Sequence, residues 1–201
     1  MADRVQFWFD PVSPWCWAAA RWIQAVEPER DIDLSFHVMS LAVLNEGKEL
    51  PEPVRSIVAG SWPYLRVLIA VEDLHGQRGL RHLYNAIGSH LHERKSRSET
   101  IEIIGECLRS CEMSEELLLH AQAVEHDARI RASHTARSDD DGSTSGAPTI
   151  RINGNPFFGP AISRVPAGPE AAEIFDAIST LVSYPYLFEY QKTRTEMPVF
   201  G

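Results

Sequence analysis

The stretch that most constrains the fold of this chain is residues 7–17, with the sequence FWFDPVSPWCW. Apolar residues typical of a buried strand lead into a turn marked by two prolines, and the turn opens a helix. Ser13 is a residue type that caps helices, and Pro14 suits the first helical position because its missing N–H would have no partner there. A turn of this kind directs the positive end of the helix dipole at whatever lies above it and favours a bound anion.

One thiol, that of Cys16, lies in the first turn of this predicted helix. As the third helical residue it can reach back toward the cap, so we expect the Ser13 hydroxyl and the Cys16 sulfur to be neighbours. The hydroxyl and the free N–H groups of the helix would then lower the pKa of the thiol and make it a nucleophile. The alternative is a small, buried and inert side chain. The cap, the proline and the flanking tryptophans favour the functional thiol.

The Ser-Pro-Trp-Cys motif at 13–16 resembles the Cys-X-X-Cys active site of DsbA-type thioredoxin-fold oxidoreductases, with serine in place of the first cysteine. The chain is especially similar to the actinobacterial mycothiol-dependent nitroreductase-like subgroup. The segments that carry this resemblance are 7–11, 21–23, 36–41, 148–150, 158–160 and 193–196. The resemblance implies an α/β protein, a thioredoxin fold with a large helical insertion subdomain. Ser13 stands where the family has its attacking thiol, so dithiol turnover is chemically excluded at this motif.

Two predicted strands with a helix between them form the first structural unit. The ranges are 5–9 and 31–39 for the strands and 14–26 for the helix. A right-handed crossover would make the two strands parallel. A long run with helical apolar periodicity follows, and a break at His75-Gly76 divides it.

This helical run separates two α/β halves of the chain. We therefore predict a thioredoxin-like domain over 1–52 and 138–201 and a helical insertion subdomain over 53–137. The resemblance implies that the insertion covers the active site. Residues 138–146, rich in aspartate, serine and glycine, are expected to form a flexible polar link rather than a calcium loop.

The second half opens with a strand over 147–152 that has a proline near its start. Proline is unusual in a central strand because it cannot donate to the ladder of hydrogen bonds. The resemblance places at Pro148 a cis-proline that faces the active-site helix. It also implies that the backbone of Ala147 can pair with a substrate.

The remainder of the chain reads as a hairpin, a helix and an aromatic tail. Asn153-Gly154 predicts the hairpin turn before a return strand over 156–159. A last helix is expected over 169–179. The tail at 184–190 is expected to pack as a cover and to contribute a dimer contact if the protein is a homodimer rather than a monomer.

The formal net charge of −9 over 201 residues argues against nucleic acid as a partner. The N-terminus lacks the apolar run of a signal peptide, and no stretch is expected to span a membrane. We therefore predict a cytoplasmic protein that acts on a small-molecule substrate, free or carrier-bound. In that reducing compartment Cys107 and Cys111, four residues apart on a predicted helix, are expected to pack in the core.

Aromatic side chains around one thiol suit a flat, conjugated substrate. Trp15 lies between cap and thiol, and His37 on the second strand is a candidate proton donor or acceptor beside them. The predicted catalytic residues are Cys16 and Ser13, and the predicted substrate-binding residues are Trp15, His37, Trp62, Tyr64, Ala147, Pro148 and Phe158. No metal site is expected, because neither His90 and His92 nor His120 and His126 have ligand spacing.

Three functions are compatible with one thiol and one hydroxyl. The first, which the sequence argument favours, is addition of the Cys16 thiolate to an electron-poor double bond, rotation and release, a cis–trans isomerisation with no required cofactor. Kappa-class glutathione transferases and 2-hydroxychromene-2-carboxylate isomerases, which this turn also resembles, carry Ser-Pro there and use a glutathione thiol. The second is a mycothiol-dependent oxidoreductase, nitroreductase or thiol transferase, or a Cys-to-Ser variant of one, in which Ser13 activates a low-molecular-weight thiol such as mycothiol or glutathione. The third is a binding protein without chemistry.

Overall fold

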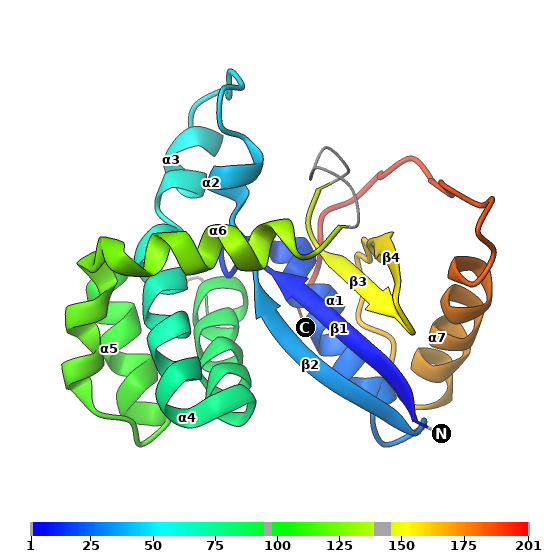
Figure 1. Ribbon diagram of the computed structural model, residues 1–201, viewed down its shortest axis with the longest axis horizontal. Coiled ribbons are helices and arrows are strands. Elements are labelled where there is room, and N and C mark those ends of the chain that lie inside the picture. The colour runs from blue at the N-terminus through cyan, green and yellow to red at the C-terminus, as the bar shows by residue number, and fades with distance from the viewer. Residues whose placement is uncertain (1, 95–97, 139–145, 201) are drawn as a thin grey trace.

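The computed structural model describes residues 2–94, 98–138 and 146–200 (Figure 1). The polar link predicted over 138–146 therefore lies, apart from its two end residues, outside the described residues. The division into a thioredoxin-like domain and an insertion stays a prediction in its exact boundaries. The helical run between the two α/β halves is present.

The described residues form one mixed sheet of order β2-β1-β3-β4. Its strands are β1 (Asp3–Phe9), β2 (Ile32–Val38), β3 (Thr149–Ile152) and β4 (Asn155–Phe158). β1 runs parallel to β2 and antiparallel to β3, which continues into β4 as a hairpin. The Asn153-Gly154 turn has φ values of 51° and 91°, as a two-residue hairpin of this kind requires.

Helices α1 (Pro14–Val26) and α7 (Pro169–Val182) pack together on one face of the sheet. Figure 1 shows α1 behind the strands and α7 at the right, beside the β3–β4 hairpin. The indole N–H of Trp22 donates to the carbonyl of Ala171 at 3.0 Å, which ties the two helices together. The buried side of α1 is therefore the surface that meets α7 and β1.

Between β2 and β3 the described chain forms helices of three kinds, of which all but the first lie in the predicted insertion. They are α2 (Leu41–Leu44), α3 (Val54–Ala59), α4 (Trp62–Gly88), the π-helix η1 (Ser89–Glu93), α5 (Thr100–Ser110), the 3₁₀ helices η2 (Glu115–Gln122) and η3 (Val124–His126), and α6 (Asp127–Thr135). The break expected at His75-Gly76 is a kink inside α4, where Gly76 has a φ of 64°. A side chain rarely adopts that conformation, so glycine allows the helix to bend there.

The insertion joins the sheet through an aromatic cluster. Tyr84 on α4 stacks on Phe9 of β1, with ring centroids 3.7 Å apart, and meets Trp17 of α1 edge to face at 5.8 Å. Gly88 makes room for this contact, because a Cβ there would lie 2.2 Å from a ring carbon of Trp17. The core of the sheet and the core of the insertion are thus continuous.

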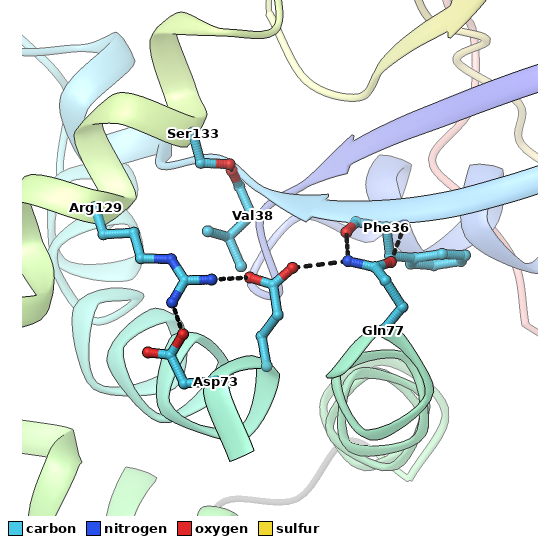
Figure 2. A network of polar contacts seen from close by, with 7 residues as sticks. Phe36, Val38, Asp73, Gln77, Arg129 and Ser133 are labelled. Atoms are coloured by element: carbon cyan, nitrogen blue, oxygen red, sulfur yellow. Dashed lines mark hydrogen bonds and ion pairs between the residues drawn. The ribbon is translucent and has the colours of Figure 1, made fainter. Parts of the chain in front are cut away.

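Side chains of the insertion also pair the backbone of the edge strand β2 (Figure 2). The Gln77 amide accepts from the N–H of Phe36 at 2.8 Å and donates to its carbonyl at 3.0 Å. From α6, the Ser133 hydroxyl donates to the carbonyl of Val38 at 2.7 Å, while Arg129 pairs with two carboxylates of α4. This network satisfies polar groups that an edge strand otherwise leaves open.

One helical run, Val54–Glu93, is long and apolar enough to cross a membrane by length and composition. The expectation that no stretch reaches this threshold is therefore wrong. Half of its most apolar window is buried inside the protein, and the buried side chains of α4 belong to the shared core. A core helix passes the same test of length and hydropathy, and burial accounts for the apolar side chains of this run that belong to the core.

Candidate active site

A buried carboxylate organises the turn between β1 and α1. The Asp10 side chain accepts from the N–H of Val12 at 3.1 Å and from the N–H of Leu41 at 2.7 Å. Burial raises its pKa to about 6, against the opposing effect of those N–H groups and of the Ser61 hydroxyl. Its carbonyl accepts from the N–H of Ser13 at 3.1 Å, so Asp10 holds both the turn and the loop after β2.

Ser13 is the N-cap of α1, as the sequence predicts. Its backbone is extended, with φ −87° and ψ 114°, and its hydroxyl oxygen accepts from the N–H of Cys16 at 3.2 Å. Pro14 occupies the first helical turn. The hydroxyl therefore lies at the positive end of the α1 dipole, where a negative charge is stabilised.

The Cys16 thiol differs from the expectation in one decisive respect, because the side chain is fully buried in the core. Burial raises its pKa to about 12, and the hydrogen bonds from Ser13 and from the Asp10 backbone, which lower it, are weaker than this desolvation. The prediction of a lowered thiol pKa is wrong. A thiol in this environment stays protonated at neutral pH and is a poor nucleophile.

The other two thiols are also buried. Cys107 and Cys111 on and after α5 are 3% and 8% exposed and belong to the hydrophobic core, as predicted. Burial raises the pKa of Cys107 to about 12 and also raises the pKa of Cys111. All three cysteines of the chain are free in this structure. Burial therefore disfavours the thiolate form of each of them.

The start of β3 lies beside the active-site turn. The Ala147–Pro148 peptide is cis, and the Pro148 carbonyl accepts from the N–H of Gly159 at 2.9 Å. Phe158, the last residue of β4, packs so closely on Gly146 that a Cβ there would lie 2.6 Å from the ring. These contacts fix the Phe158 ring next to the Pro148 backbone.

Arg194, which the sequence argument did not single out as a site residue, lies beside Trp15 and Phe158, and we call these three residues the rim of the candidate active site. The guanidinium of Arg194 lies over the ring of Trp15, 5.0 Å from its centroid, and over the ring of Phe158 at 5.7 Å. Arg194 lies in the 193–196 segment, which carries part of the family resemblance, and that resemblance was the sequence feature that could have pointed to it. Trp15 of α1, Phe158 of β4 and Arg194 of the C-terminal segment are therefore neighbours.

A hollow of about 340 Å³ opens beside the first residues of α1. It is lined by Pro14, Leu91, His92, Pro198, Val199 and Phe200. The Nε2 of His92 lies 2.8 Å from the Pro11 carbonyl, which can only accept, so Nε2 carries a proton. A larger hollow, of about 400 Å³, lies between β2 and α4, away from the turn.

The C-terminal segment, residues 183–200, returns across the molecule from α7 to α1 (Figure 1). The N–H of Val199 donates to the carbonyl of Ser163 at 2.8 Å, and the ring of Phe200 lies 6.0 Å from that of His92. The expected packing of the aromatic tail is wrong, however, because Phe188 is 89% exposed. The last residues, rather than 184–190, cover the site.

His37 was predicted to act beside the thiol, and the structure places it on the other face of the sheet. Its ring stacks on Trp8 at 4.7 Å, and its Nε2 lies 3.0 Å from the Ser35 hydroxyl. Side chains alternate along a strand, so Trp8 faces away from Phe7 and Phe9, which share the core with α1. Burial lowers the pKa of His37 to about 4, so the ring is neutral at pH 7.

Two predicted substrate contacts from the insertion point elsewhere. Tyr64 is 3% exposed, and burial raises the pKa of its hydroxyl against the opposing effect of Thr100 at the start of α5, so the side chain presents little surface to a substrate in this structure. The ring of Trp62 lies against the guanidinium groups of Arg66 and Arg131, at 5.5 and 5.7 Å, which places it where α4 meets α6. The insertion approaches the turn through His92 of η1, next to the Pro11 carbonyl, and through Ser61, next to the Asp10 carboxylate.

Two histidines that appeared to lack partners bond to each other. His120 Nδ1 and His126 Nε2 lie 2.8 Å apart across the end of η2. Sequence spacing alone did not reveal this pair, because His120 lies in η2 and His126 in η3, and the bend at Ala123 between them brings the rings together. No group of three or more histidine, cysteine or acidic residues in the described part of the chain is arranged to hold a metal ion.

The chain is similar to proteins of known family. A family model described as "Rv2466c-like: Mycothiol-dependent nitroreductase Rv2466c" matches residues 12–192. A curated relative, "Uncharacterized protein Rv2286c" of Mycobacterium tuberculosis (strain ATCC 25618 / H37Rv), is 24% identical over 199 residues, which are 97% of this chain and 84% of that protein.

Solved structures of DsbA-type proteins share the fold. The probable DsbA oxidoreductase SCO1869 from Streptomyces coelicolor aligns with a TM-score of 0.59 and 16% identity, over 96% of this chain and 94% of that one. DsbA from Chlamydia trachomatis aligns with a TM-score of 0.60 and 11% identity, over 89% of this chain and 87% of that one. The molecule is therefore an α/β protein with the DsbA thioredoxin fold, including the helical insertion.

Proposed function

Because this chain belongs to the Rv2466c-like family of mycothiol-dependent nitroreductases, we propose that it is a cytoplasmic oxidoreductase that depends on a low-molecular-weight thiol. The observation that carries the proposal is the contrast between Ser13 and Cys16. The hydroxyl caps α1 at the positive helix end, on a residue that keeps 5% exposure, while Cys16 has none and its sulfur has a pKa raised to about 12. The reactive sulfur therefore comes from a bound low-molecular-weight thiol, and the family makes mycothiol the first candidate.

The residues around the turn fit such a thiol. The hollow beside Pro14, at about 340 Å³, has the size of a small-molecule site. The Ser13 oxygen accepts from the Cys16 N–H, and its hydroxyl also hydrogen-bonds to the Cys16 sulfur. In this proposal the hydroxyl proton turns from that neutral thiol to a bound thiolate, which is the stronger acceptor. Charge-assisted hydrogen bonds of this kind, with the α1 dipole, lower the pKa of a bound thiol.

Each remaining site residue has a positioning role in this proposal. Trp15 offers an aromatic surface for a flat, electron-poor acceptor, and the Ala147 backbone beside Pro148 can hydrogen-bond to either reactant. When bound, the thiol supplies the electrons: two thiols become one disulfide while a nitro group takes up two electrons and two protons, giving a nitroso group and water. The protein contributes orientation and charge stabilisation.

Thiolate-assisted isomerisation, the reading that the sequence argument preferred, is not supported. It requires the Cys16 sulfur to attack a substrate, and the sulfur has no exposed surface. It also requires a thiolate, which a pKa of about 12 makes scarce at neutral pH.

The test compares two substitutions in a mycothiol-dependent assay with a neutral acceptor, 4-nitrobenzamide, by following thiol consumption. Ser13→Ala should lower kcat/KM about tenfold or more, because a charge-assisted hydrogen bond is lost. Cys16→Ala should leave kcat/KM within about threefold, because the sulfur does not react. Ser114→Ala is the matched control, since that serine also caps a helix, accepting from Glu116 N–H at 3.2 Å.

Two outcomes would refute the proposal. Turnover by the wild-type protein without any added thiol would remove the need for a cofactor sulfur. Loss of activity in Cys16→Ala, with the variant folded by circular dichroism, would return catalysis to the protein thiol.

A further inference from the structure

Arg194 differs from many other arginines of the described chain in what surrounds its charge. Arginines that form ion pairs with carboxylates are Arg21, Arg30, Arg55, Arg66, Arg81, Arg109, Arg129, Arg131 and Arg164. In the part of the chain that the structure describes, no carboxylate lies within ion-pair distance of the Arg194 guanidinium. Its neighbours are the aromatic rings of Trp15 and Phe158.

Two aromatic rings flank the guanidinium of Arg194. Its Cζ lies over the ring of Trp15, 5.0 Å from the centroid, and over the ring of Phe158 at 5.7 Å, and the residue is exposed to solvent. The rings attract the cation without neutralising its charge. The exposed guanidinium can therefore present its planar fork of N–H donors to a carboxylate.

The two rings belong to the two halves of the candidate active site. Trp15 follows Ser13 by two residues in the first turn of α1. Phe158 pairs with Thr149, the residue after Pro148, in the β3–β4 register. The cation therefore lies at the rim where the α1 turn and the Pro148 segment meet.

The chain on the C-terminal side of Arg194 is anchored, so the position of the cation is defined. Glu196 is hydrogen-bonded to the Ser163 hydroxyl and lies 3.9 Å from Arg164. The N–H of Val199 donates to the carbonyl of Ser163 at 2.8 Å. These contacts hold the segment across the rim.

The net charge of the chain makes the positive potential near Arg194 a local feature, so an anion is favoured there over the rest of the surface. A net charge of −9 disfavours the approach of anions to most of the surface. At the rim, the Arg194 guanidinium and the positive end of α1 act in the same direction. We infer that Arg194 is a specificity-determining residue, which binds the carboxylate of a small molecule that enters the candidate active site.

Two sources of that carboxylate are compatible with the geometry, the acceptor substrate and the thiol. Mycothiol carries no carboxylate, whereas glutathione and N-acetylcysteine do. The turnover measurements rest on the proposed function, whereas calorimetric binding of a carboxylate does not. Calorimetry therefore tests the role of Arg194 even if the proposed thiol-dependent activity fails.

The first arm of the experiment varies the acceptor at a fixed mycothiol concentration. We expect Arg194→Gln to lower kcat/KM for 4-nitrobenzoate about tenfold, because a charge-assisted hydrogen bond is lost, and to leave 4-nitrobenzamide unchanged. The second arm varies the thiol with 4-nitrobenzamide fixed, comparing N-acetylcysteine with its amide. A selective loss for N-acetylcysteine would assign the carboxylate to the thiol instead.

Lys192→Gln is the matched control, because it removes one exposed positive charge two residues away in the same segment. Calorimetric titration of 4-nitrobenzoate should show tighter binding than 4-nitrobenzamide in the wild type and no such preference in Arg194→Gln. Equal losses for charged and neutral compounds in Arg194→Gln would indicate a role in holding the segment and would overturn the inference. Charge selectivity that survives in Arg194→Gln, in both arms and in the titration, would overturn it as well.

Discussion

The Asp10→Asn substitution probes the electrostatics of the turn that carries Ser13. Asp10 is fully buried, and burial raises its pKa from 3.8 to about 6. The folded state therefore binds this proton more tightly than the unfolded state. The resulting contribution to stability is present below about pH 4 and is lost as the pH rises through about 6.

The size of the effect follows from the shift. A displacement from 3.8 to about 6 corresponds to about 3 kcal/mol over the full titration. Between about pH 5 and about pH 7.5, roughly 1.4 kcal/mol of this is lost. Asparagine does not titrate, so the stability of the wild type relative to Asp10→Asn should fall by that amount over the interval.

Urea denaturation of both proteins across this pH interval measures the difference and cancels the other titrating groups. Asp176→Asn is the control, because that carboxylate is exposed, pairs with Arg30 and has a lowered pKa, so it is fully ionised throughout. A difference between wild type and Asp10→Asn that does not change with pH would refute the reasoning that burial dominates at this site.

Two further substitutions test how the insertion is attached. Gln77→Ala leaves the backbone N–H and carbonyl of Phe36 without their side-chain partner and should lower the free energy of unfolding by about 1–3 kcal/mol in urea titrations. A loss indistinguishable from zero would mean that water replaces the amide. Gly88→Ala places a methyl group 2.2 Å from a ring carbon of Trp17 and should destabilise by about 1–3 kcal/mol, measured in the same way. Unchanged stability there would contradict the close packing of α4 on α1.

The elements that the sequence predicted well are those whose cause is local. The cap at Ser13, the proline at the helix start and the kink at Gly76 depend on a few neighbouring residues, and each is present. The helical run between β2 and β3 follows from apolar periodicity in the same way. The part of that run after Ser114 is a 3₁₀ helix, a distinction that apolar periodicity does not make.

The candidate site shows where local reasoning ends. Sequence spacing placed the Cys16 sulfur near the Ser13 hydroxyl but gave no measure of how much core would surround it. His37 and Tyr64 had the right chemistry for a site, yet sheet alternation and helix packing turned both away from it. Arg194 was the opposite case, because its contact with Trp15 joins residues almost a full chain length apart.

The sequence by itself determined the strand–turn–helix with a hydroxyl at the positive helix end, since capping and dipole effects act within one turn of chain. Only the tertiary structure decided that Cys16 is desolvated and unreactive and that Arg194 stands at the rim. Burial and long-range contacts depend on every element that packs around a side chain, and no local pattern contains that information.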